Sequence, residues 1–201
     1  MWALIEDGSI TKIINKPRGM IIDNIQYSRN IFSFRWSNEE REAIGLYEIV
    51  WDNSKKKDEE YYTNTNQTFT YDADAGTVTA TYGDATANPH ADTLFTADDE
   101  DNGLGTEGEV AARGVKYNKI RTIKKQAAGE LQKTDWYIVR KADADTAVPS
   151  AITNHRAAVR TKCAQMETAI TNASNTAAIE TLYTRDADGV RPLGDLPTLE
   201  V

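Results

Sequence analysis

The chain has 201 residues, a formal net charge of −8, 40% hydrophobic residues and 27% charged residues. This length and composition allow one domain or two small ones. The negative charge argues against nucleic-acid binding, because no strong basic patch is present to overcome it. No apolar run approaches the roughly 20 residues of a membrane span, and the N-terminus lacks the pattern of a signal peptide. We therefore expect no nucleic-acid partner, no membrane insertion and no secretion.

Residues 1–83 have the pattern of a small antiparallel β domain. Residues 2–5 and 10–14 are expected to form two strands, because the Asp7-Gly8 pair between them is typical of a tight hairpin turn. The Thr-rich and aromatic segments later in this region indicate a second hairpin. The further strands are expected at residues 20–22, 46–51, 67–71 and 77–82.

A short helix is expected after Ser37. Ser37 and Glu40 have the spacing of a capping box, and Gly45 can adopt the left-handed conformation that ends a helix. The adjacent Glu39 and Glu40 could be read as acid/base catalysts, but helix capping explains both carboxylates without an active-site cleft. We adopt the capping interpretation.

The turn at residues 72–76 faintly resembles a calcium-binding loop, because it contains Asp72, Asp74 and Gly76. A calcium loop of this type needs a closing glutamate and flanking helices, whereas this segment lacks the glutamate and is flanked by expected strands. We interpret it as a hairpin turn.

Residues 84–114 are dominated by Ala, Asp, Thr and Gly, with an acidic run at residues 98–101. A segment of this composition cannot bury enough apolar area to offset its conformational entropy. We expect a linker here, followed by a helical module at residues 115–184.

The helical module is expected to contain four helices. The first covers residues 115–132, with a stripe at Tyr117, Ile120, Lys124, Ala127 and Leu131 and with Ile123 beside it. The last covers residues 176–183. Thr134 is a candidate N-cap for the second helix and Pro149 is a candidate first residue for the third. Trp136 follows Thr134, and its size predicts a buried anchor at the corner between helices.

The third helix has a clear buried face, because six residues recur at alternating spacings of four and three. Arg156 is the only charged member of this face. Its methylene groups could cover the core while its guanidinium reaches Asp135, Asp143 or solvent; alternatively, it could bind a partner. The six residues are Ile152, Arg156, Val159, Cys163, Met166 and Ile170.

Cys163 is the only cysteine in the chain, so no intrachain disulfide can form. Its position on the buried face predicts a small core residue. With His90 and His155 as the only histidines, a Cys/His zinc site is not expected, and the sequence predicts no metal and no cofactor.

Residues 185–201 are expected to be extended, because prolines and glycines interrupt the segment. Leu193, Leu196 and Leu199 are regularly spaced along it. They could dock onto a partner protein, or the tail could fold back over its own domain. Both interpretations stay open at this point.

One region carries a family resemblance. It contains Leu131, then Thr134-Asp135-Trp136-Tyr137, Arg140-Lys141-Ala142, Val148-Pro149 and Arg156-Ala157-Ala158-Val159-Arg160. This pattern resembles the C-terminal helical region of tailed-phage tail proteins, a group commonly labelled tail fibre assembly protein or tail assembly chaperone. Residues 1–8 resemble the start of such proteins in marine phages. The resemblance covers roughly the C-terminal third and carries over no catalytic residues.

The resemblance and the residues together predict an α+β protein of four parts: a β domain at 1–83, a linker at 84–114, a helical module at 115–184 and a tail at 185–201. The resemblance implies a non-enzymatic tail protein in an oligomeric assembly, bound to other tail or tail-fibre proteins in the virion and present in the host cytoplasm during assembly. The partner-binding candidates are Arg156, Leu193, Leu196 and Leu199. An assembly chaperone absent from the virion, and a small hydrolase with a nonsequential Asp and His site, are the alternatives.

Overall fold

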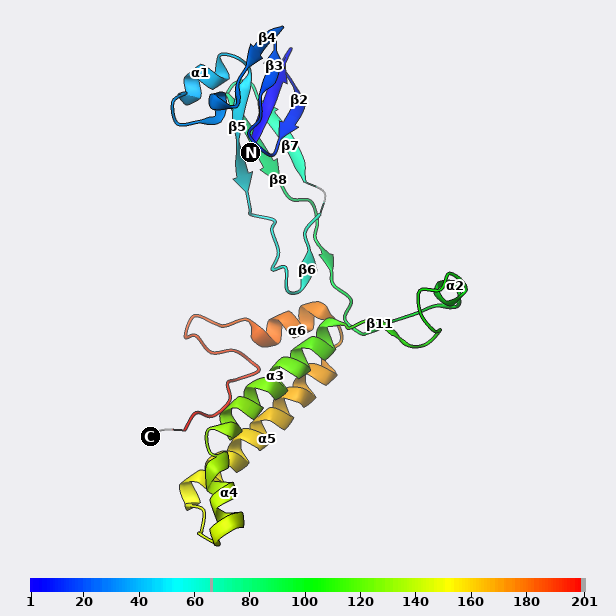
Figure 1. Cartoon of the computed structure of the whole chain (residues 1–201), viewed down its shortest axis with the longest axis vertical. Helices are drawn as coiled ribbons and strands as arrows, with labels where there is room; N and C mark the ends of the chain where they lie inside the picture. The colour runs from blue at the N-terminus through cyan, green and yellow to red at the C-terminus, as the bar shows by residue number, and fades with distance from the viewer. Residues whose placement is uncertain (66, 200–201) are drawn as a thin grey trace. The chain divides into compact units, whose positions relative to one another are not determined.

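The computed structural model describes residues 1–65 and 67–199, and its chain divides into two compact units. Met1–Glu59 and Thr63–Thr86 form the N-terminal unit, which contains the main sheet. Glu60–Tyr62 and Ala87–Val201 form the second unit, which contains the long helices (Figure 1). The predicted α+β class is confirmed. The short segment Glu60–Tyr62 joins the helical unit although it lies within the sequence of the β domain.

The N-terminal unit is built on a five-stranded sheet in the order β2-β1-β5-β8-β7. Its edge strands β2 and β7 also contact each other, so the sheet curls back on itself. The pairs are antiparallel except for β5 and β8, which run parallel and depart from the antiparallel pairing expected for this domain. The strands are β1 (Trp2–Glu6), β2 (Ser9–Ile14), β5 (Leu46–Asp52), β7 (Thr68–Asp72) and β8 (Thr77–Thr81).

Both faces of the sheet bury apolar side chains. Ala3, Ile49, Val78 and Ala80 form one buried cluster. The other face buries a second cluster that includes residues of β3 (Met20–Ile22) and of a 3-10 helix (Arg29–Phe32), with side chains of β4 (Ile25–Tyr27) packed against it. The members of the second cluster are Leu4, Ile14, Met20, Ile22, Ile31 and Leu46.

Two hairpin turns use left-handed residues. Asp7 and Gly8 have φ values of 50° and 73° and join β1 to β2, which confirms the predicted turn. Asp23 and Asn24, with φ values of 48° and 63°, join β3 to β4 in the same way. The second hairpin was not predicted, although Asp and Asn tolerate this conformation better than most residues.

The predicted capping box is present at helix α1 (Asn38–Glu42). The Ser37 hydroxyl accepts a hydrogen bond from the Glu40 amide, and the Glu40 carboxylate accepts one from the Ser37 amide. Gly45 follows the helix with φ of 76°, as predicted. In the hairpin between β7 and β8, the Asp72 carboxylate accepts hydrogen bonds from the amides of Asp74 and Ala75. This confirms that residues 72–76 form a turn.

Residues 84–114 contain short ordered elements, where the sequence predicted a linker. Strand β10 (Thr93–Leu94) pairs with β11 (Val110–Ala112), and α2 (Ala97–Asp101) lies between them with Thr96 as its N-cap. Strand β9 (Thr86–Ala87) pairs with β6 (Tyr62–Thr63). Most side chains here stay exposed, so hydrogen bonds rather than an apolar core define the segment.

The second unit is built on α3 (Val115–Gln132) and α5 (Ser150–Asn172), which pack along each other, with α4 (Asp135–Ala144) between them in sequence and α6 (Thr176–Tyr183) after them (Figure 1). All six residues of the predicted α5 face are buried. The predicted stripe on α3 needs correction, because Tyr117 is exposed. The buried residues of α3 are Val115, Lys119, Ile123 and Ala127.

A matched pair of valines tests this core. Val159→Ala should lower the free energy of unfolding of the helical unit by about 2 kcal/mol or more, because Val159 is fully buried and its loss leaves a cavity. Val139→Ala should change it by less than about 0.5 kcal/mol, because Val139 is exposed. Denaturant unfolding followed by circular dichroism measures both, and equal effects would contradict the assigned core.

Candidate functional site

The corner between α3 and α4 is fixed by a buried group of polar atoms. Thr134 is fully buried, and its hydroxyl donates to the carbonyl oxygen of Leu131 at 3.0 Å. Nη1 of Arg156, from α5, lies 2.7 Å from the same carbonyl oxygen and 2.8 Å from the Thr134 hydroxyl. The Leu131 carbonyl also accepts from the Thr134 amide, and Arg156 adds a charged donor to this helix end.

Asp135 completes this arrangement, with its Oδ1 atom 2.7 Å from Nη1 of Arg156. The Arg156 side chain is 9% exposed, whereas that of Asp135 is 54% exposed. We call Leu131, Thr134, Asp135 and Arg156 the corner knot. The predicted reach of Arg156 to Asp135 is confirmed, and its guanidinium is occupied within its own unit, which leaves it little surface to offer a partner.

Thr134 stands at the N-cap position of α4, as predicted, but its hydroxyl makes no cap bond to an amide of that helix. It bonds instead to Leu131 and Arg156. The start of α4 is therefore attached to α3 and α5 through the corner knot.

Helix α4 itself has no buried residue. Trp136, Ile138 and Val139 are exposed, and we call these three residues the α4 surface. The prediction that Trp136 is a buried anchor is wrong, because its side chain is 53% exposed. The polar corner knot holds the start of the helix, so this position does not require burial of the indole.

The exposed indole is nevertheless held in place. The rings of Trp136 and Tyr137 lie 4.1 Å apart between centroids, and the Arg140 guanidinium lies 4.7 Å from the Trp136 ring. Trp136 and Val139, three residues apart, lie on the same side of α4. Trp, Tyr and Arg are enriched among the residues that dominate binding energy at interfaces. The α4 surface is therefore the candidate interaction site.

The C-terminal tail folds onto the helical unit. Leu193 is 3% exposed, lies in the same core cluster as Ile123 and Met166, and its amide donates to the carbonyl of Leu182. Leu196 packs against this cluster and Leu199 is half-buried, while residues 200–201 lie outside the described part. This is the second of the two arrangements considered for the tail, and it leaves Leu193 almost no surface for a partner.

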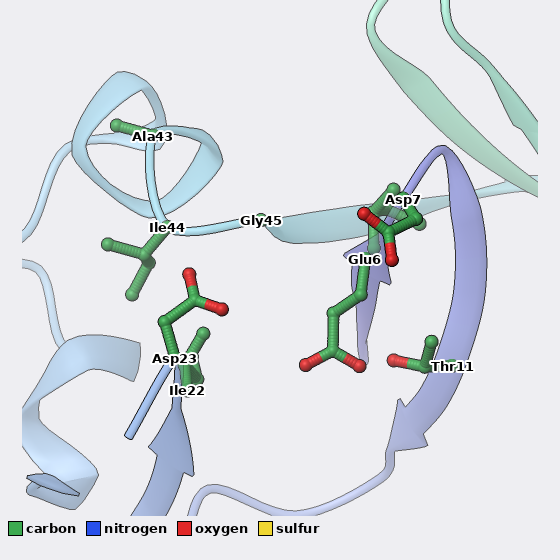
Figure 2. A pocket seen from close by; sticks show the side chains of 9 residues that line it. Glu6, Asp7, Thr11, Ile22, Asp23, Ala43, Ile44 and Gly45 are labelled. Atoms are coloured by element: carbon green, nitrogen blue, oxygen red, sulfur yellow. The ribbon is translucent and has the colours of Figure 1, made fainter. Parts of the chain in front are cut away.

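A hollow of about 480 Å³ in the N-terminal unit is lined by the two hairpin turns and the end of α1 (Figure 2). Figure 2 shows the carboxylates of Glu6 and Asp23 on opposite sides of it, with Asp7 and Thr11 nearby. Such a lining attracts cations, but it contains no histidine, serine or cysteine. In residues 1–65 and 67–199, no group of His, Cys, Asp and Glu side chains is arranged to hold a metal ion.

Cys163 occupies the core position predicted for it. Its thiol lies 3.4 Å from the Glu167 carboxylate, and burial raises the pKa of the Cys163 thiol. Because the thiolate is the reactive form, this environment disfavours nucleophilic chemistry at Cys163.

Comparisons with protein families, with curated proteins and with solved structures gave no match. Within the described part of the chain, no helix is both long enough and apolar enough to cross a membrane.

The exposed α4 surface was missed by the sequence reasoning, although a signal for it exists. Residues 136–139 read Trp-Tyr-Ile-Val, four large apolar residues in a row. Successive residues of an α-helix are about 100° apart, so these four point around about 300° of the helix. A single packing face cannot bury them all, and some of them must stay exposed unless another protein covers them.

Arg156→Ala should destabilise the helical unit by about 2–4 kcal/mol, because the buried Thr134 hydroxyl and the Leu131 carbonyl lose a charged donor. Arg160→Ala is the matched control, since Arg160 is exposed on the same helix, and it should cost less than about 0.5 kcal/mol. Thermal unfolding of both variants tests this. Similar stability of the two variants would contradict the structural role of the corner knot.

Leu193→Ala should lower the stability of the helical unit by about 2–5 kcal/mol, because it removes a buried core side chain. Val190→Ala, at an exposed position of the same tail, is the control. If chemical denaturation finds Leu193→Ala as stable as the control, the tail is not part of this core.

Proposed function

We propose that this chain is a non-enzymatic bacteriophage tail protein, a tail-fibre-associated structural or adaptor component that acts by binding other tail or tail-fibre proteins. The observation that carries the proposal is the α4 surface, a helix with Trp136, Ile138 and Val139 exposed and its start tied to buried Arg156. The family resemblance falls on this same region of the sequence.

The residues that carry the resemblance divide into two roles. Thr134, Asp135 and Arg156 belong to the corner knot and fix the helix. Trp136 lies directly beside them and is exposed. Because these bonds fix the first turn of α4, the neighbouring aromatic residue loses less conformational entropy on binding, which favours recognition.

Electrostatics also supports a protein partner. The chain has 31 acidic and 23 basic residues, and Arg41, Lys119 and Arg156 are buried. The exposed part of the chain is therefore more acidic than the formal charge indicates, which disfavours nucleic acid.

Trp136→Ala should weaken capture of the tail or tail-fibre partner by roughly 30-fold, the loss expected when a dominant interface aromatic is removed. Stability should fall by only about 1–2 kcal/mol, because half of the indole is exposed and the rest contacts Tyr137 and Arg140. Phe34→Ala is the matched control, since Phe34 is 94% exposed in the N-terminal unit. Affinity purification of tagged full-length chains from phage-producing cells, with quantitative mass spectrometry, measures both effects.

Equal recovery of partners by wild type and Trp136→Ala would contradict the role of the α4 surface. Mass spectrometry of purified particles then separates the two forms of the proposal. Stoichiometric presence identifies a structural component, and absence despite partner capture in cells identifies the alternative, an assembly chaperone.

A further inference from the structure

The segment Glu60–Tyr62 lies against the helical unit although it comes from the connection between β5 and β7. Tyr61 is 4% exposed and belongs to the core cluster of α3, α5 and α6. Residues 53–60 before it are exposed, Tyr62 after it is half-buried, and Thr63 is exposed. One buried tyrosine is thus inserted into a helical core from an exposed connection, in the manner of a bound peptide.

The slot that receives this segment is built around Lys119 of α3. The Lys119 ammonium lies 2.6 Å from the Glu60 carboxylate, and 4.3 Å and 4.2 Å from the ring centroids of Tyr61 and Tyr183. Only 6% of the Lys119 side chain is exposed. A buried ammonium is costly without compensation, and here the carboxylate and the two ring faces provide it.

Each residue of the segment meets a different group. Glu60 pairs with Lys119, and the Tyr62 hydroxyl donates to the Glu180 carboxylate of α6 at 2.7 Å. The Tyr61 carbonyl accepts from the Asn88 amide at 2.9 Å, a bond of the kind that holds extended peptides. The slot thus has a place for an acidic side chain, an aromatic ring and a tyrosine hydroxyl, in that order.

Space remains beside the docked segment. A hollow of about 300 Å³ adjoins Glu60 and is lined in part by Arg113, Val115 and Lys119. Its two cations are paired within the chain, Arg113 with Asp92 and Lys119 with Glu60, so an acidic side chain of a partner would take the place of Glu60 at Lys119.

We propose that this slot is a recognition site for an extended acidic–aromatic–tyrosine segment, occupied in cis by Glu60–Tyr62 and opened to the same kind of segment on a protein partner when Glu60–Tyr62 lifts away. Lifting breaks local contacts and leaves the two main clusters of the sheet intact, since none of the residues Glu60–Tyr62 belongs to either cluster. The inference rests on the proposed function only in taking the partner to be a protein.

The test uses the full chain and a fluorescent peptide with the sequence of residues 57–65. In the full-length Glu60→Ala/Tyr61→Ala/Tyr62→Ala variant all three docked side chains are removed, and this variant should bind the peptide at least tenfold more tightly than wild type does. Adding Lys119→Met should reduce that affinity at least tenfold. A vacated chain that keeps its helical circular dichroism but binds the peptide no better than a scrambled peptide overturns the proposal.

Hydrogen exchange of the wild-type chain tests the opening of the segment even where the triple variant fails to fold. The amides of Tyr62 and Asn88 should exchange faster than that of Ile123, because the segment opens without global unfolding. Tyr62→Phe should accelerate their exchange about tenfold through loss of the bond to Glu180, whereas Glu59→Gln, the control, should not. Exchange of these amides only at the rate of the core overturns the proposal. Neither assay contains tail proteins, so their outcome is independent of partner capture through α4.

Discussion

The buried guanidinium of Arg156 is the constraint on which the candidate site depends. Its Nη1 atom lies within hydrogen-bond distance of three oxygens, one each from Leu131, Thr134 and Asp135. These oxygens belong to the end of α3 and the start of α4, so one side chain of α5 joins three helices. Helix α4 has only ten residues and no buried side chain, which makes it too short to be stable alone. Polar bonds at its start therefore take the place of apolar burial.

The same device recurs elsewhere in the chain. Arg41 donates to the carbonyls of Ile31 and Ser33 in the N-terminal unit, and Lys119 pairs with Glu60 in the helical unit. Each buried cation lies where a loop or helix end brings oxygen atoms into the interior. Cations in these positions satisfy acceptors that the small apolar clusters cannot. An acidic protein thus places part of its positive charge inside, where it fixes chain segments.

Local patterns predicted much of the fold. The spacing of residues on α5, the capping box at Ser37 and the turn at Asp7 and Gly8 are determined by residues close in sequence, and all were confirmed. Long-range features were not predictable in this way. The parallel pairing of β5 with β8 and the docking of Glu60–Tyr62 depend on residues distant in sequence.

The candidate site was predicted only in part. Arg156 and its contact with Asp135 followed from helical periodicity and from the expected reach of a long side chain. Trp136 was predicted to be buried from its size and its position after the N-cap. That prediction overlooked that four consecutive apolar residues point to different sides of a helix. Size sets how much free energy burial can supply, but the position of a residue on the helix decides whether burial occurs.

Site-specific photo-crosslinking tests the central claim most directly. A photoreactive amino acid at Val139 replaces an exposed side chain of the α4 surface and leaves the corner knot intact. In cells that produce phage particles, irradiation should join this position to one tail or tail-fibre protein, whereas the same group at exposed Phe34 should not. Equal labelling of unrelated proteins from both positions, in a chain that is folded and abundant, would contradict binding through α4.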